Sequence, residues 1–152
     1  MSATRIDLLK NHPATTKAMM ALENQLRAGT LPITLKELVK MRVSQINGCA
    51  FCIDLHVDAA RKQGETDRRL HLLAAWREAG VFDARECAAL AWAEALTRLA
   101  GTQGVPEAVY DALAAQFSEA EIVELTLAVV AINGWNRFQI GFRAQPANAA
   151  AA

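Results

Sequence analysis

Apolar residues recur along most of this chain at spacings of three and four positions, the pattern of amphipathic helices. The interval 15–27, for example, carries Met19, Leu22 and Leu26 at this spacing. No segment shows a convincing strand pattern. We therefore predict an all-α fold, a bundle of about six or seven helices, with helical segments near residues 15–27, 34–46, 49–63, 66–80, 83–101, 106–117 and 118–143.

Capping patterns mark several of the predicted helix ends. Thr34-Leu-Lys-Glu37, Asp83-Ala-Arg-Glu86 and Ser118-Glu-Ala-Glu121 each place a capping side chain three residues before a glutamate, as at a helix start. Gly48 and Gly64 follow apolar helical runs and can adopt the left-handed conformation that closes a helix. The segment that begins at residue 49 is therefore expected to start a new helix.

The segment Ile122–Ile132 is apolar nearly all round instead of on one stripe. A helix of this kind is buried on every side. Because 53% of the chain is hydrophobic, we expect a neighbouring subunit to complete this burial, and hence a homo-oligomer. The alternative is a central helix in a monomeric bundle.

Length, charge and the absence of long apolar runs indicate the domain organisation, the partners and the location to expect. The 152 residues are expected to form a single domain, 1–152, with its core at about 35–143 and a frayed tail at 145–152. Sixteen basic and sixteen acidic residues cancel, so we expect neither a nucleic-acid partner nor an anionic membrane surface as a partner. Met1–Lys10 lacks the apolar core of a secretory signal, and no run is long enough to span a bilayer, so a cytoplasmic location is expected.

Two of the three cysteines lie in the segment Cys49-Ala-Phe-Cys52-Ile-Asp-Leu-His56. In a helix, residues three, four and seven apart share one face, so Cys49, Cys52 and His56 would lie on a single stripe. The start of a helix lowers the pKa of a thiol, because free N–H groups and the helix dipole stabilise the thiolate. Cys52 is therefore the expected nucleophile, and His56 is the expected base.

This motif and its surroundings resemble the alkylhydroperoxidase AhpD-like branch of the carboxymuconolactone decarboxylase family. The resemblance rests on Glu37, the C-x-x-C pair and His56. Further segments are also similar in sequence: Lys40–Cys49, Ala59-Ala-Arg61 with Gly64, Ala75-Trp-Arg77 and Ile132–Arg137. It covers the chain from about Leu35 to Arg143. It implies an all-helical fold, assembled into trimers or hexamers, and a thiol-dependent peroxidase activity.

The resemblance also implies a role for each residue. Cys52 would attack the peroxide and become a sulfenic acid, and Cys49 would condense with it to a disulfide. Glu37 and His56 would form the proton relay. The expected partners are a hydroperoxide substrate and an external dithiol or lipoyl-type reductant. No cofactor and no bound metal are expected.

The chain departs from the family pattern at Phe51, because the well-described peroxidases have a histidine between the cysteines. Glu37 could not contact the cysteines along one straight helix, which would hold it ~18 Å from Cys49 at 1.5 Å per residue. Contact requires the second helix to fold back, which could bring His56 nearer Glu37 than either cysteine, or a carboxylate from another subunit. A local capping role with Thr34 is the alternative for Glu37.

Three other functions fit the same residues. The chain could act as a general disulfide oxidoreductase or redox sensor. It could be a zinc module in which Cys49, Cys52 and His56 are ligands and a fourth comes from elsewhere. It could also be a decarboxylase, the other activity of the wider family. Cys87 is expected to pack as a small hydrophobic residue, and a pocket lined by Phe51, Leu55 and tryptophan is expected to favour an apolar organic group.

Overall fold

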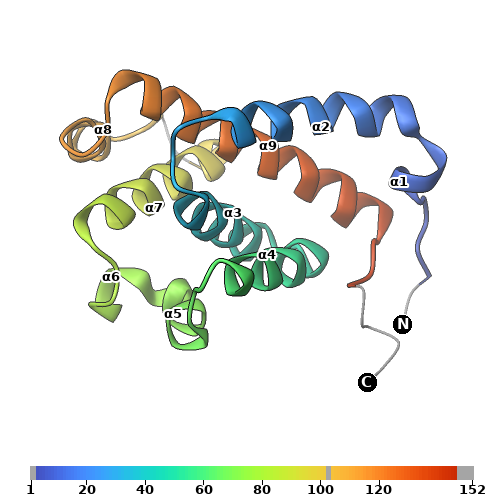
Figure 1. Cartoon of the computed structure of the whole chain (residues 1–152), viewed down its shortest axis with the longest axis horizontal. Helices are drawn as coiled ribbons and strands as arrows, with labels where there is room; N and C mark the ends of the chain where they lie inside the picture. Colours follow the sequence, from blue (N-terminus) through green and yellow to red (C-terminus); the bar gives the residue numbers. More distant parts are fainter. Residues whose placement is uncertain (1–2, 102–103, 147–152) are drawn as a thin grey trace.

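A computed structural model of the protein describes residues 3–101 and 104–146, and all regular structure in these residues is helical (Figure 1). This confirms the predicted all-α fold. The α-helices are α1 (Leu8–Asn11), α2 (Pro13–Ala28), α3 (Ile33–Asn47), α4 (Ala50–Lys62), α5 (Asp67–Leu72), α6 (Trp76–Ala79), α7 (Ala84–Thr97), α8 (Glu107–Ala114) and α9 (Glu119–Phe142). Two short 3-10 helices are η1 (Leu73–Ala75) and η2 (Leu99–Gly101). Most of the predicted frayed tail, residues 147–152, lies outside the described residues.

The number of helices exceeds the six or seven predicted, for two reasons. The segment predicted as one helix over 66–80 is divided into α5, η1 and α6. The four-residue helix α1, capped by the Asp7 side chain, is too short to show periodicity. The capping boxes of α7 and α9 are present, whereas the predicted box at Thr34 is wrong, because α3 begins at Ile33 without a side-chain cap.

Helix α3 lies at the centre of the molecule and packs against α4, α7 and α9, while α2 lies along α9 (Figure 1). The buried residues form three apolar clusters. The largest joins one face of α3 to α7, α8 and α9 and includes both motif cysteines, at the start of α4. The core therefore surrounds the segment that carries the candidate chemistry.

Helix α9 is not enclosed on every side by its own chain. Leu125, Val129 and Ile132 are buried in the core, but Val123 and Val130 have 64% and 55% of their surface exposed. A single chain therefore does not complete the burial of α9, and the expected contribution of a neighbouring subunit stays a prediction. Within residues 3–101 and 104–146, no helix is long and apolar enough to cross a membrane.

Candidate active site

A sharp turn between α3 and α4 positions the two motif cysteines. Gly48 ends α3 with a φ of 71°, and its N–H donates to the carbonyl oxygens of Ser44 and Gln45. A side chain at this φ is strained, which accounts for the glycine. Cys49 follows as the N-cap of α4, where its Sγ accepts a hydrogen bond from the N–H of Cys52 at 3.3 Å.

Cys49 and Cys52 are joined by a disulfide across the first turn of α4, with their Cα atoms 5.3 Å apart. The structure therefore represents the oxidised pair. Both residues are buried, at 1% and 2% exposure, but they differ in access. Cys52 is among the described residues that line a cavity, and Cys49 is not. A molecule in the cavity would reach the sulfur of Cys52 first.

His56 and Glu37 meet within one chain because α4 folds back against α3. His56 Nδ1 lies 2.6 Å from Glu37 Oε2, and both side chains are largely buried. The carboxylate therefore comes from the same subunit, and Glu37 contacts His56 and does not cap α3. Such a contact fixes the orientation of the imidazole and leaves the other ring nitrogen free to act in the cavity.

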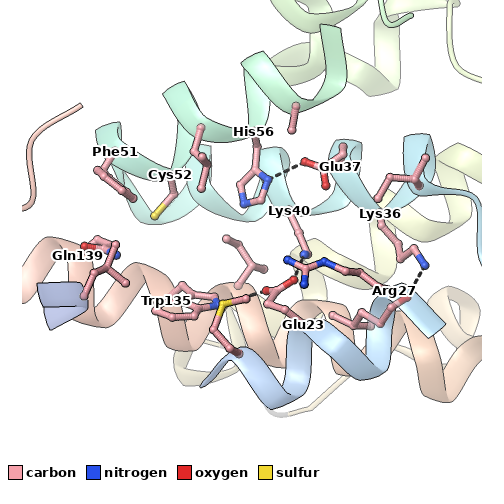
Figure 2. Close-up of a pocket in the computed structure, with 17 residues that line it drawn as sticks. Glu23, Arg27, Lys36, Glu37, Lys40, Phe51, Cys52, His56, Trp135 and Gln139 are labelled. Atoms are coloured by element: carbon pink, nitrogen blue, oxygen red, sulfur yellow. Dashed lines mark hydrogen bonds and ion pairs between the residues drawn. The ribbon is translucent and has the colours of Figure 1, made fainter. Parts of the chain in front are cut away.

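The cavity has a volume of about 400 Å³, between α3 and α4 on one side and α2 and α9 on the other (Figure 2). Its described lining combines apolar side chains with a smaller set of polar and charged ones: Leu9, Met20, Glu23, Leu26, Arg27, Ile33, Lys36, Glu37, Lys40, Phe51, Cys52, Leu55, His56, Ala59, Ile132, Trp135 and Gln139. A mostly apolar cleft with a few polar groups is typical of a small-molecule site. The expected contributions of Phe51, Leu55 and a tryptophan to the pocket are confirmed.

A second group of polar residues on this cavity was not found from the sequence. Lys40 Nζ lies 2.5 Å from Glu23 Oε2, and Trp135 Nε1 donates to Glu23 Oε1 at 3.2 Å. These contacts join α3, α2 and α9. One sequence signal could have revealed part of the group. The run 35–40 mixes apolar residues with Lys36, Glu37 and Lys40, and every residue in it is buried, so its charged side chains need partners.

Two other residues considered from the sequence, Asn136 and Cys87, pack within the fold and do not line the cavity. Asn136 is 1% exposed and bonds to Asn47 and Ser44, which satisfies polar groups between α3 and α9. Cys87 is in α7, and burial raises the pKa of its thiol, an effect that the carboxylates of Glu86 and Asp83 increase. In residues 3–101 and 104–146, no three His, Cys, Asp or Glu side chains are grouped so that they could hold a metal ion.

This fold is that of a known family. A model of the carboxymuconolactone decarboxylase family matches residues 13–95, which is more than half of the chain and a range that contains Glu37, Cys49, Cys52 and His56. The chain belongs to this family, and it is an AhpD-like member of it.

Individual relatives agree with this assignment. The uncharacterized protein YdfG of Bacillus subtilis is 40% identical over 136 residues, which are 90% of this chain and 92% of the relative. A crystal structure of a protein of unknown function from Agrobacterium tumefaciens, provisionally described as the antioxidant defence protein AhpD, has a TM-score of 0.91 and 43% identity, over 95% of this chain and 98% of that one. The debrominase Bmp8, in complex with 2,3,4-tribromopyrrole, shares the fold with a TM-score of 0.80 and 21% identity, over 90% of this chain and 73% of that one.

Proposed function

We propose that this protein is a thiol-dependent peroxidase that reduces hydroperoxides through the Cys49 and Cys52 pair. The similarity to AhpD-like proteins supports a peroxidase-related role. The observation that carries the finer proposal is the position of Cys52, which lines a cavity large enough for an organic molecule and is bonded to a second cysteine behind it. A hydroperoxide entering this cavity meets one sulfur, and a second sulfur is within bonding distance.

In the first step, the thiolate of Cys52 attacks the terminal oxygen of the hydroperoxide. A sulfur–oxygen bond forms and the oxygen–oxygen bond breaks, so Cys52 is oxidised to the sulfenic acid and the peroxide is reduced to an alkoxide. The alkoxide takes up the proton that Cys52 lost and leaves as the alcohol. The position of Cys52 in the first turn of α4 favours its thiolate.

In the second step, the thiol of Cys49 attacks the sulfenic sulfur of Cys52. The disulfide forms, and the hydroxyl group leaves with the proton of Cys49 as water. One hydroperoxide and two thiols thus give one alcohol, one water and one disulfide. An external dithiol, for which a lipoyl-type group is the proposed example, then reduces the disulfide by exchange and is itself oxidised.

His56 and Glu37 are proposed to move the proton between these steps. His56 lies one turn beyond Cys52 on α4 and lines the same cavity, so its ring is placed to accept the thiol proton and return it to the leaving oxygen. Glu37 is a positioning residue, because its 2.6 Å contact with Nδ1 fixes the ring and stabilises the imidazolium. Phe51 lines the cavity as an apolar wall, in the place of the additional histidine of the related peroxidases.

Counting thiols before and after peroxide tests the proposal. The protein is fully reduced, exposed to one equivalent of hydrogen peroxide or cumene hydroperoxide, and alkylated, and each cysteine is read by mass spectrometry. We expect Cys49 and Cys52 to be protected as a disulfide while Cys87 remains a free thiol. In Cys49→Ser, the sulfenic acid of Cys52 should persist and react with dimedone.

Two variants provide the controls. Cys87→Ser should behave as the wild-type protein, whereas Cys52→Ser should leave Cys49 reduced. Loss of no thiol, or of Cys87 alone, would show that the pair is not a peroxide-reactive site.

A further inference from the structure

The cavity has two chemically different ends (Figure 2). Figure 2 shows Phe51, Cys52 and Gln139 at one end and Lys36 at the other. The Arg27 side chain extends from the end of Lys36 toward Lys40 and Glu23, which approach each other across the middle of the cavity. The reactive sulfur and the cationic side chains therefore occupy different parts of the cavity, whose lining also includes the apolar side chains of Ile132 and Leu26.

Arg27 differs from Lys36 and Lys40 in its bonding. Lys36 Nζ donates to the carbonyl of Leu26 at 2.6 Å and pairs with Glu124 at 3.1 Å. Lys40 pairs with Glu23. Arg27 donates to the neutral side-chain oxygen of Asn24 at 2.9 Å, and among the described residues it makes no ion pair with a carboxylate.

The carboxylates on the cavity are already engaged. Glu37 contacts His56, and Glu23 accepts from both Lys40 and Trp135. Arg27 is exposed, and its guanidinium extends into the cavity beside Lys40 and Glu23, so it can still bind an anion that enters with a ligand. The planar fork of a guanidinium fits a carboxylate with two parallel hydrogen bonds.

The size of the cavity suits an organic ligand. Its 400 Å³ lies in the range of pockets for small organic ligands and is more than tenfold the roughly 30 Å³ that a water molecule occupies in the liquid. An organic molecule with an apolar body can therefore fill the space between the sulfur of Cys52 and the guanidinium of Arg27.

From these contacts we infer that the site is selective for anionic organic hydroperoxides, in which an apolar skeleton carries the peroxide at one end and a carboxylate at the other. Arg27 is the specificity-determining residue that binds the carboxylate. The reaction itself rests on the proposed function, but recognition of the organic acid does not require the thiols.

Kinetic selectivity is the first test. Oxidation of the reduced protein is followed in stopped flow with cumene hydroperoxide carrying a para-carboxylate and with the methyl ester of the same compound. The carboxylate should react roughly tenfold faster, as expected for one charge-assisted contact. This ratio should fall towards one in Arg27→Gln and be largely kept in Arg27→Lys. Arg68→Gln, which removes an exposed cation of α5 remote from the cavity lining, should keep the wild-type ratio.

Binding of unreactive ligands is the second test. In calorimetry, 4-isopropylbenzoate should bind the wild-type protein roughly tenfold more tightly than 4-isopropylbenzamide, and Arg27→Gln should remove the difference. Equal rates and equal affinities for the charged and neutral compounds, with normal disulfide formation, would overturn the inference and leave the proposed function intact. Tight binding of the benzoate through Arg27, with no thiol oxidation by any peroxide, would support the ligand class and contradict the proposed function.

Discussion

At the scale of single residues, the contact between His56 and Glu37 connects two helices at the cavity wall. A histidine and a carboxylate that act as one unit have non-additive effects on a rate. The stopped-flow oxidation rate of the Cys49 and Cys52 thiols should therefore fall about 100-fold in His56→Gln, since general acid–base catalysis typically contributes at least this factor.

The Glu37→Gln variant provides the matched test of positioning. It should lower the same rate by a smaller factor, because the amide can still contact Nδ1 and orient the ring of His56 but carries no charge. The double variant should be no slower than His56→Gln alone. Independent, multiplying effects of the two substitutions would show that the pair does not work as a relay, and thermal unfolding of each variant checks that the fold is kept.

At the scale of elements, the turn at Gly48 determines where α4 begins. A Cβ at this position would meet no atom within 4 Å, so the cost of Gly48→Ala comes from its positive φ alone. We expect the free energy of unfolding to fall by roughly 1 kcal/mol in urea denaturation. Gly141→Ala, in the last turn of α9, where an added Cβ would also meet no atom within 4 Å, is the control and should leave stability unchanged or raise it. An equal loss in both variants would contradict the role of the turn.

Glu94 ties α7 to α3 and to the short helix α6. It is 3% exposed and accepts hydrogen bonds from Arg42 at 2.7 Å, Trp76 at 3.0 Å and Arg77 at 2.5 Å. Burial alone raises the pKa of the Glu94 carboxyl, but the hydrogen bonds from Trp76, Arg77 and Arg42 outweigh it, so its pKa lies below the ordinary value of 4.5.

A carboxyl whose pKa is lower in the folded than in the unfolded state stabilises the fold above its unfolded pKa. This contribution is lost as the pH falls through the lowered, folded pKa. Glu94→Gln should therefore reduce the free energy of unfolding by roughly 2 kcal/mol at pH 7. The difference between the variant and the wild-type protein should shrink below about pH 4. A difference that is constant from pH 7 to pH 3 would show that the charge is not responsible.

The elements also show what the sequence can and cannot predict. The long helices α2, α3, α4, α7 and α9 were predictable, because their apolar residues recur at helical spacing and, in α7 and α9, the capping boxes agree with it. The break between α5 and α6 was not, because Leu70, Leu73 and Trp76 keep helical spacing through it, and packing of these residues in a shared cluster decides the path of the chain. The pattern at Thr34 was misleading, since Glu37 contacts His56 and not the start of α3.

The candidate site, too, was predictable from the sequence only in part. The cysteine pair and His56 share one helix, so their spacing was sufficient to place them together. The meeting of Glu37 with His56 depended on how α4 folds against α3, and the Glu23, Lys40 and Trp135 group joins three helices. Contacts between residues far apart in the chain leave at most a partial local signal, here the charged residues of the run 35–40, which is why this second group was found only in the structure.

At the scale of the whole molecule, an exposed apolar stripe on α9 supports the expectation of a homo-oligomer. Val123 and Val130 lie seven residues apart, on one face of the helix, and are more than half exposed. We predict a trimer or hexamer of the 16.5 kDa chain in light scattering. Replacing both valines with lysine should lower the measured mass, because a buried apolar contact would become charged.

The matched control places one lysine in α8 and one at its C-cap, as Ala112→Lys and Ala115→Lys, where both alanines are exposed. This variant should keep the mass of the wild-type protein. A wild-type mass equal to one chain, or equal masses for both double variants, would contradict an interface on the α9 stripe.

The burial of both sulfurs also determines which electron donors can regenerate the protein. Cys49 is buried in the core, and Cys52 lines the cavity. We therefore expect a thin, flexible arm that carries two thiols at its tip to reduce this disulfide faster than a broad, rigid redox protein does. Turnover of the protein would then depend on the supply of such a slender donor.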